Sequence, residues 1–404
     1  MSRLSRYDKE AMTLSCPHFG ECGGCTELTT PIAAQRAAKL VAVREALGPQ
    51  TENLEFGFTD QPDREPRHDR LRILYPVQPD SERGLRMGLY RRGSHQAIEI
   101  QSCELQHPAL TTIAQRAQQI FRQRSMDPYD EHRHQGLLRA FHARLSASTG
   151  EVLLGVVTTG EPLPDPHGLA RELFDAARDL PVARGKHSTP VGVVHNRNPK
   201  PGNVLLGQQS VVLTGRDHLF DKVDGLTFRV GFASFYQLHR RAQSLLYQPA
   251  MAMLAPYMTG AHIVDAYGGV GTFALRCVRR NAGAVTLVEN HPQACEDAAF
   301  NSQANNTPIK VLRASFPDAD IQSPDLLIVD PTRAGLQPAG CAKVSRLAAP
   351  QLLYVACSLP ALARDLAELP QYRLAELQLA DLFPHTAHVE LLARLEHRPS
   401  GHRG

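Results

Sequence analysis

Two side chains near the end of the chain are of types that perform covalent catalysis. Cys357 follows the apolar run 352–356, and Glu390 ends a mixed stretch that begins at Asp381. A thiolate can attack an electrophilic carbon, and a carboxylate can remove a proton from the resulting adduct. Each residue also has a structural interpretation, because a cysteine at a strand end is commonly a small buried apolar group and a lone glutamate is commonly a surface charge.

A glycine-containing loop further upstream has the character of a nucleotide-cofactor site. The segment 264–273 leads from an expected strand into an expected helix, and its glycines are Gly268, Gly269 and Gly271. Glycines let the backbone approach a ligand closely at the carboxyl edge of a parallel sheet. Glu289 ends the next expected strand, where a carboxylate can accept hydrogen bonds from both ribose hydroxyls of an adenosyl group. The spacing is not that of a dinucleotide loop, and a structural turn is the alternative.

Asp330 adds a third polar strand end, because the apolar run 326–329 stops at Asp330-Pro331. A methyl-donor site, one thiolate and one carboxylate together fit the methylation of carbon 5 of uracil. In that reaction a thiolate adds to C6, C5 attacks the methyl group of S-adenosylmethionine, and a base removes the C5 proton so that the cysteine can leave. Efficient addition requires Cys357 to be more acidic than a free thiol, whose pKa is about 8.5.

In order and composition these segments resemble the RNA uracil-5-methyltransferase family, over residues 16 to 395. Ser234-Phe235-Tyr236-Gln237 is similar to the family's Phe-Phe-Gln segment at the cofactor site, and the segments 363–365 and 383–390 also follow in family order. The resemblance implies an S-adenosylmethionine-dependent enzyme with Cys357 as nucleophile and Glu390 as general base. It also implies a set of residues that hold the cofactor or line its site: Gln237, Tyr267, Thr272, Glu289 and Asp330.

Three positions depart from the family pattern. The usual Asp-Pro-Pro-Arg reads Asp330-Pro331-Thr332-Arg333, and the usual Ser-Cys-Asn-Pro reads Ala356-Cys357-Ser358-Leu359-Pro360. The cysteine that is common before the glycines of the loop is replaced by Gly268. None of these changes removes a group that the reaction needs. They bear on the turn after Cys357 and on the choice of substrate.

A cysteine cluster near the start of the chain indicates a metal site. Cys16, Cys22 and Cys25 lie within one short segment, and Cys103 can supply a fourth thiolate. Four thiolates suit either zinc or an iron–sulfur cluster, and spacing alone does not separate the two. The family resemblance implies a [4Fe-4S] cluster, with zinc as the alternative occupant. We expect a structural or RNA-binding role, because methyl transfer needs no electron.

The pattern of elements predicts two kinds of sheet. Expected strands within 68–103, a hairpin formed by 137–146 and 151–159, a helix over 166–178 and strands near 191–194, 204–206, 211–213 and 226–230 indicate an antiparallel α+β region. Helices are also expected from Thr30-Pro31 to Gly48 and from 236 to 257. Beyond about 235, strands alternate with helices, which is typical of a mostly parallel, doubly wound α/β sheet.

These patterns and the resemblance predict three parts in the 404 residues. Residues 1–105 hold the cysteine cluster and are interwoven with a central domain. Residues 50–234 form that central α+β domain, which is expected to contact RNA. Residues 235–404 form a class I S-adenosylmethionine-dependent methyltransferase domain.

Composition limits the partners. The net charge of +3 permits nucleic-acid binding without requiring it, and the segment 64–92 is rich in arginine but also carries acidic residues. No apolar run marks a signal peptide in Met1–Met12 or a membrane span elsewhere, so a cytoplasmic protein without a membrane partner is expected. Nothing suggests more than a monomer.

RNA is the expected partner. Only 15 residues precede Cys16, so the β-barrel RNA-binding domain of many relatives is expected to be absent. The target uridine must leave its stack, so an unpaired loop, most simply in 23S ribosomal RNA, is the expected substrate. Two alternatives stay open: a methyltransferase for protein or a small molecule, which needs neither Cys357 nor Glu390, and a non-enzymatic RNA-binding protein with a structural metal.

Overall fold

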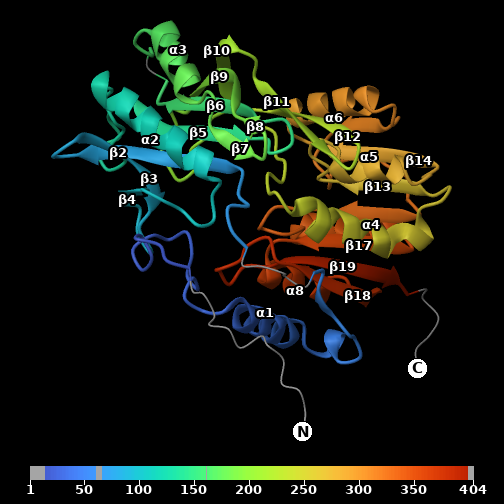
Figure 1. Cartoon of the computed structure of the whole chain (residues 1–404). Helices are drawn as coiled ribbons and strands as arrows, with labels where there is room; N and C mark the ends of the chain where they lie inside the picture. The colour runs from blue at the N-terminus through green and yellow to red at the C-terminus, as the bar shows by residue number, and fades with distance from the viewer. Residues whose placement is uncertain (1–13, 61–65, 161, 399–404) are drawn as a thin grey trace.

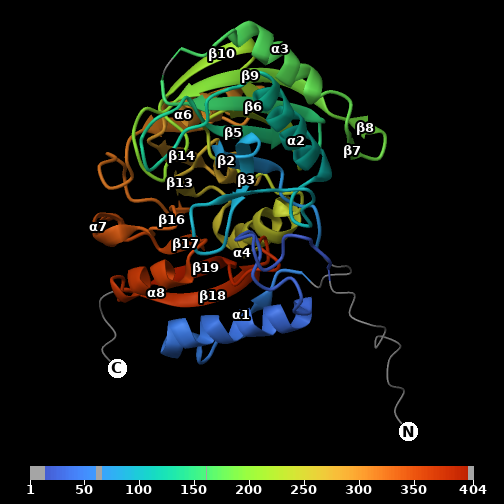
Figure 2. The same cartoon turned by 90° about the vertical axis from the view of Figure 1, so that its left-hand side faces the viewer.

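The computed structural model describes residues 14–60, 66–160 and 162–398. The segment Met1–Met12, in which no signal peptide is expected, lies outside these residues, as does Arg64 of the arginine-rich segment. Two large β-sheets with helices packed against them make up the molecule (Figure 1, Figure 2). Within the described part, no helix has both the length and the apolar character that a membrane crossing requires.

The larger sheet has eight strands in the order β1-β18-β19-β17-β16-β13-β14-β15. All neighbouring strands are parallel except at β19, which runs antiparallel to both β17 and β18. Its strands are β1 (Gly57–Phe58), β13 (His262–Ala266), β14 (Ala284–Glu289), β15 (Lys310–Arg313), β16 (Leu326–Val329), β17 (Gln351–Ala356), β18 (Tyr372–Ala380) and β19 (Glu390–His397). The expected α/β sheet with mostly parallel strands is confirmed.

Helices cover this sheet, and buried side chains alternate between its two faces. On β16, Leu326 and Ile328 join one apolar core, whereas Leu327 and Val329 join another. Since successive side chains of a strand point to opposite faces, a strand covered on both sides needs an uninterrupted apolar sequence. The helices around it are α4 (Gln248–Leu254), α5 (Thr272–Val278), α6 (Pro292–Ala304), α7 (Gln337–Leu347) and α8 (Leu359–Ala367).

The smaller sheet has seven strands in the order β10-β9-β6-β5-β2-β3-β4, and all its pairs are antiparallel except β6 with β9. Helices α2 (Pro108–Gln123) and α3 (Pro166–Ala176) pack against it (Figure 1). The strands are β2 (Arg72–Asp80), β3 (Gly84–Tyr90), β4 (Ala97–Glu99), β5 (Leu138–Leu145), β6 (Glu151–Thr158), β9 (Thr189–Arg197) and β10 (Gln209–Gly215), with a small hairpin of β7 (Pro181–Ala183) and β8 (Lys186–His187) beside them. The predicted hairpin across residues 147–150 is confirmed as β5 and β6.

A two-stranded hairpin, β11 (His218–Val223) with β12 (Leu226–Gly231), lies between the two halves and contacts both β6 and α6. On α6, the buried Asp297 carboxylate accepts hydrogen bonds from Arg229 Nε and Ser234 Oγ, both at 2.6 Å. Asn301 Nδ2 donates to the carbonyls of Arg229 and Val270 at 3.1 and 3.0 Å. Helix α6 thereby fixes the segment that follows β12 beside the glycine loop.

Helix α1 (Ile32–Leu47) comes from the start of the chain but packs against α8 (Figure 2). The fully buried Asp381 carboxylate accepts hydrogen bonds from Lys39 Nζ at 2.7 Å and Arg36 Nε at 3.3 Å. Gln35 Oε1 accepts a hydrogen bond from His385 N at 2.7 Å. Residues 32–58, through α1 and β1, therefore add to the sheet that the sequence pattern assigned to residues 235–404 alone.

Several predicted elements are wrong in detail. Residues 204–206 form no strand, because the Asn198 side chain, rather than a neighbouring strand, donates to the carbonyls of Val204 and Leu205. The helix expected over 236–257 is a π-helical turn (Gln243–Tyr247), α4 and a 3₁₀ turn (Ala255–Tyr257). Helix α1 begins after Pro31 without a side-chain cap. Helix α2 was not predicted.

We predict that Asp381→Asn destabilises the protein strongly. Asp381 is 0% exposed and pairs with Arg36 and Lys39, so its neutralisation leaves the buried Lys39 without its counter-charge and Arg36 with Asp60 alone. Loss of one partner of a buried ion pair costs about 3–5 kcal/mol. Chemical denaturation should show this loss as a lower denaturant concentration at the midpoint of unfolding. The control Asp175→Asn, which removes the exposed ion pair with Arg178, should leave the midpoint unchanged. Equal midpoints for the two variants would contradict the assignment.

Candidate active site

Three polar side chains meet at one edge of the larger sheet, as the sequence predicts for Asp330, Cys357 and Glu390. Asp330 follows the last residue of β16, Cys357 follows the last residue of β17, and Glu390 is the first residue of β19. In the antiparallel pair, Ala356 lies opposite Leu391, so the next position brings Cys357 and Glu390 face to face. The antiparallel direction of β19 is what brings its first residue to the carboxyl ends of β16 and β17.

The turn after Cys357 accounts for the changed motif there. Ser358 is the N-cap of α8, and its hydroxyl accepts a hydrogen bond from Ala361 N at 3.4 Å. Pro360 then falls in the first helical turn, where a missing backbone N–H has no cost. The proline shift therefore leaves the strand–cysteine–helix connection intact.

Asp365 supports the neighbouring loop that contains Thr332 and Arg333. Its buried carboxylate accepts hydrogen bonds from Leu336 N at 2.6 Å and from the Tyr354 hydroxyl at 2.7 Å. Gly335 of that loop has φ +77°, and an added Cβ would lie 2.4 Å from the Asp365 carboxylate. Thr332 and Arg333 themselves are exposed. The segment 363–365, part of the sequence resemblance, therefore has a positioning role here.

The charges around Cys357 do not make it acidic in the protein alone. Burial, followed by the nearby carboxyls of Glu390 and Asp330, raises the pKa of the Cys357 thiol to about 11, while Arg333 lowers it. Burial also raises the pKa of Glu390 to about 8 and that of Asp330 to about 7. The expectation of a thiol more acidic than a free cysteine is thus wrong for the ligand-free protein, because burial and two carboxyls outweigh one exposed guanidinium.

Glu289 and the glycine loop are held together by backbone hydrogen bonds. The Glu289 carboxylate accepts from Gly269 N at 3.0 Å through Oε2 and from His291 N at 2.7 Å through Oε1. Each oxygen keeps a second lone pair with which it can accept a further hydrogen bond. A Cβ at Gly268 would lie 2.6 Å from Leu287 Cγ, so Leu287 occupies the space that a loop cysteine would need.

Asp265 is a buried carboxyl that the sequence placed in this loop but did not single out. Burial raises its pKa to about 8, with further contributions from Asp330 and Glu289. Its Oδ2 accepts a hydrogen bond from Ala274 N at 2.9 Å, and its Oδ1 has no partner among the described residues. Asp265 is the second-to-last residue of the buried strand β13. A carboxylate at the carboxyl end of an apolar strand was the signal in the sequence that could have identified it.

The other predicted cofactor residues flank the loop. Tyr267 has a left-handed backbone with φ +60°, and its ring lies 5.6 Å from that of Phe316. Thr272 is the first residue of α5 and interacts with the Tyr247 hydroxyl. Gln237 is half-buried, and no side-chain hydrogen bond ties it to the loop within the described chain. The neighbouring Phe235 ring is 63% exposed, an aromatic surface that the sequence analysis quoted but did not assign.

A cavity of about 360 Å³ opens beside Cys357. Besides Cys357 and residues 358–360, it is lined by Lys39, Arg333 and the segment 387–389. Sequence reasoning missed Lys39 as a lining residue, because α1 is far from the sheet in the sequence and nothing local indicates that the two meet. His388 lies in the segment 383–390 of the resemblance but was given no role.

The four cysteines of the predicted metal site interact with one another. Burial, followed by the charges of Cys103, Cys22 and Cys16, raises the pKa of Cys25 to about 12. Their thiols are free, and Gly24 N donates a hydrogen bond to Cys22 Sγ at 3.2 Å. Arg70 lies close enough to Cys22, Cys25 and Cys103 to be affected by their charge. Over the described residues, no three His, Cys, Asp or Glu side chains are arranged to hold a single metal ion.

Comparisons with known proteins agree with this architecture. The chain superposes on the crystal structure of Pyrococcus abyssi tRNA (uracil-54, C5)-methyltransferase in complex with S-adenosyl-L-homocysteine, with a TM-score of 0.72 over 94% of this chain and 86% of that one, at 24% identity. The fold is therefore that of the class I S-adenosylmethionine-dependent methyltransferases. Residues 320–398 match the tRNA (uracil-5-)-methyltransferase family, and residues 247–326 match a family described as conserved hypothetical protein 95.

Relatives of full length extend this likeness. An uncharacterized RNA methyltransferase of Halalkalibacterium halodurans is 30% identical over 94% of this chain and 82% of its own length. Another, of Gloeobacter violaceus, is 31% identical over 94% of this chain and 82% of its own length. The chain belongs to the RNA uracil-5-methyltransferase family, and it is an S-adenosylmethionine-dependent RNA methyltransferase.

The charges at the site predict opposite effects of two substitutions on Cys357. Glu390→Gln should lower the pKa of the thiol, and Arg333→Ala should raise it, because these groups act on it with opposite sign. Alkylation by iodoacetamide, followed by mass spectrometry of the peptide that contains Cys357, measures the thiolate fraction against pH. In the unaltered protein the rate should still rise above the pKa of a free thiol, about 8.5. A shift of both variants in the same direction would refute this description of the site.

Proposed function

We propose that the protein transfers a methyl group to C5 of a uridine in RNA through a covalent adduct between Cys357 and C6, forming 5-methyluridine. The observation that carries this proposal is the meeting of one thiol, Cys357, with the carboxyls of Glu390 and Asp330 beside a cavity. A methyltransferase for protein or small molecules has no use for a nucleophile at this position.

Each residue has a defined task in this reaction. The Cys357 thiolate adds to C6 of uracil, and the C5=C6 electron pair becomes an enolate that is nucleophilic at C5. S-adenosylmethionine supplies the methyl group. Glu390 then takes the proton from C5, the C5=C6 bond re-forms, and the thiolate leaves. A carboxyl with a pKa of about 8 is a far stronger base than an ordinary glutamate, so it suits removal of a carbon-bound proton near neutral pH.

The cofactor residues act as positioning and binding groups. Gly269 N and His291 N hold the Glu289 carboxylate in place. Its free lone pairs accept hydrogen bonds from the ribose hydroxyls of the cofactor. Tyr267, Thr272 and Gln237 line the adenosyl and methionine portions around the glycine loop. Asp330, at the end of β16, lies between this side of the sheet and Cys357, where it lines the place at which the methyl group meets C5.

The cysteines Cys16, Cys22, Cys25 and Cys103 are proposed to hold a [4Fe-4S] cluster. Support comes from four free, mutually interacting thiols that converge from two segments and from the adjacent Arg70, whose positive charge compensates bound thiolates. Thiolates at this place need a cation, since burial raises the pKa values of Cys22, Cys25 and Cys103 in its absence. The cluster would fix the segment 16–25 against β3 and the loop after it, where Gly23 N donates to Tyr90 O.

An unpaired loop of 23S ribosomal RNA is the proposed substrate, bound by a monomer. A uridine must leave its stack for C6 to reach Cys357, and a base in a loop does so at less cost than a paired base. Residues 50–234, the central region with the seven-stranded sheet, are proposed to contact the RNA outside the reacting uridine.

Substitution of the two reacting groups should separate adduct formation from turnover. Cys357→Ala should abolish both methylation and the covalent complex. Glu390→Gln should form a complex with RNA that survives a denaturing gel, because the C5 proton cannot be removed and the cysteine cannot leave. The protein is incubated with S-adenosylmethionine and unmodified 23S or transfer RNA. Nucleoside mass spectrometry then measures how much 5-methyluridine has formed. A control, Cys341→Ala on α7, should keep both activities. Turnover that persists in Cys357→Ala would eliminate the covalent mechanism.

The proposed role of Glu289 is tested by cofactor binding alone. Hydrogen bonds to a charged group are worth about 1.5–3 kcal/mol, so Glu289→Gln should weaken binding of S-adenosylhomocysteine roughly 10- to 100-fold. Isothermal titration calorimetry measures this without RNA. The exposed Glu296 on α6 provides the control Glu296→Gln, which should bind as the unaltered protein does. Unchanged affinity in Glu289→Gln would remove this residue from the cofactor site.

A further inference from the structure

Three adjoining cavities connect Cys357 with the smaller sheet. The catalytic cavity, beside Cys357, shares Arg333, Ala387 and His388 with a second cavity of about 770 Å³. The second cavity in turn shares Ser94 and His95 with a third cavity of about 580 Å³. Because neighbouring cavities have walls in common, one extended ligand can occupy all three.

The second cavity, here called the arginine cavity, is positively charged. Its lining includes four arginines and no aspartate or glutamate: Arg70, Arg91, Arg92 and Arg333. Arg92 and Arg333 are exposed, and neither forms an ion pair with a described residue. Arg91 makes only a 3.6 Å contact with Glu21, and its Nε has no hydrogen-bond partner in the described chain. Guanidinium groups presented in this way match the phosphates of a nucleic-acid backbone.

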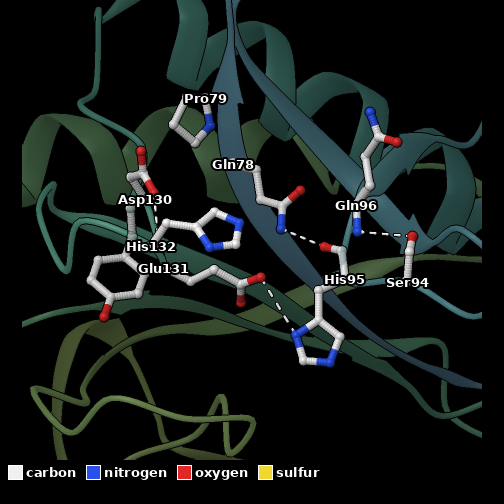
Figure 3. Close-up of a pocket in the computed structure, with 9 residues that line it drawn as sticks. Gln78, Pro79, Ser94, His95, Gln96, Asp130, Glu131 and His132 are labelled. Carbon is white, nitrogen blue, oxygen red and sulfur yellow. Dashed lines mark hydrogen bonds and ion pairs between the residues drawn. The ribbon is translucent and has the colours of Figure 1, made fainter.

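The third cavity, here called the ring cavity, has a different lining (Figure 3). The rings of His95, Tyr129 and His132 line it together with the carboxylates of Asp130 and Glu131 and the amides of Gln78 and Gln96, and no lysine or arginine lines it. Two carboxylates repel phosphate. Flat rings with hydrogen-bond acceptors around them are instead what holds an unstacked nucleobase.

The walls of the ring cavity are fixed before any ligand arrives. Gln78 Nε2 donates to His95 O at 2.6 Å (Figure 3). Gln78 Oε1 also accepts from Ala97 N at 2.7 Å, so one side chain holds the end of the β3–β4 loop that leads into β4. The His95 ring is stacked on Tyr90 at 5.4 Å and lies 3.4 Å from a Glu131 carboxylate oxygen. Such fixed walls lower the entropy cost of binding.

The opposite wall is fixed in the same manner. The Arg139 guanidinium lies 4.7 Å over the Tyr129 ring, and the Tyr129 hydroxyl is 3.0 Å from His134 Nδ1. The Asp130 carboxylate accepts hydrogen bonds from His132 N at 2.9 Å and Arg133 N at 3.2 Å. These contacts fix the Tyr129 ring and the backbone of the turn that carries Asp130 and His132.

We propose that the ring cavity binds a second, unpaired nucleobase of the same RNA, while the arginine cavity holds the phosphates that connect it to the target uridine. The base carries N–H donors toward the carboxylates of Asp130 and Glu131, as guanine, adenine and cytosine do. Uracil is disfavoured, because its single N–H lies between two carbonyl oxygens that the carboxylates repel. The inference rests on the proposed function for the identity of the RNA, and it makes the ring cavity a specificity-determining site.

A binding selection tests this directly. The probe is a pool of RNA hairpins, each with one fixed loop uridine and randomised neighbours, bound to the full-length protein and then sequenced. In the RNA that the unaltered protein binds, uracil should be depleted at one position, which lies at a fixed distance in sequence from the loop uridine. Glu131→Gln and His132→Ala should each reduce that depletion about tenfold, whereas Arg92→Ala should weaken binding of all sequences alike. The matched controls Glu296→Gln and His167→Ala, both on exposed helix positions, should keep the preference.

The possible results separate the two proposals. A selection without a preferred position, or one whose preference survives in both Glu131→Gln and His132→Ala, would overturn the ring-cavity assignment. Methylation of the same pool is read in parallel by nucleoside mass spectrometry. RNA bound with the expected preference but never methylated would contradict the proposed reaction and leave the ring-cavity assignment standing.

Discussion

The candidate active site depends on the direction of a single strand. Because β19 runs antiparallel between β17 and β18, its first residue, Glu390, lies at the edge where β16 and β17 end. In an all-parallel sheet the first residue of a strand would lie at the opposite edge, and Cys357 would have no base beside it. The segment that leads into β19 is therefore under a strict constraint, since it must return the chain to the catalytic edge.

That returning segment is fixed mainly by residues from the start of the chain. Lys39 Nζ donates to Asp381 and to the carbonyl of Phe383, at 2.7 and 3.1 Å, and Thr26 N and Glu27 N donate to His385 O. Helix α1 thus holds the segment before Glu390 at its beginning and middle. The cysteine segment 16–25 precedes α1 in the chain, so contacts that fix this segment also bear on the position of α1 and of the strand end at Glu390.

Much of the site could be predicted from the sequence, because strand ends in an α/β sheet converge wherever the strands lie. Asp330, Cys357 and Glu289 each follow or end an apolar run, and that local pattern is enough to place them at one edge. Contacts between distant segments are different. The pairing of β1 with β18 involves only two pairs of residues, and the salt bridges of Asp381 join positions more than three hundred residues apart. No local periodicity in the sequence predicts either contact.

The charge state of Cys357 was mispredicted for a related reason. The proposed reaction requires a thiolate, but the acidity of a thiol depends on its burial and on every charge around it. Here burial and two carboxyls from neighbouring strands outweigh one arginine. The ring cavity escaped notice in the same way, since its walls come from β2, the loop between β3 and β4 and the loop before β5. None of these segments, taken alone, has a sequence pattern that predicts a binding site.

Arg333 connects recognition with chemistry. It lines both the catalytic cavity and the arginine cavity, and it is the cation that lowers the pKa of Cys357 and of Glu390. An RNA phosphate bound in the arginine cavity would compete for that charge and favour the protonated forms of both groups. A phosphate held by Arg91 and Arg92 instead would leave Arg333 free to act on the thiol. The division of the four arginines between backbone contacts and the catalytic edge therefore decides how reactive Cys357 is once RNA is bound.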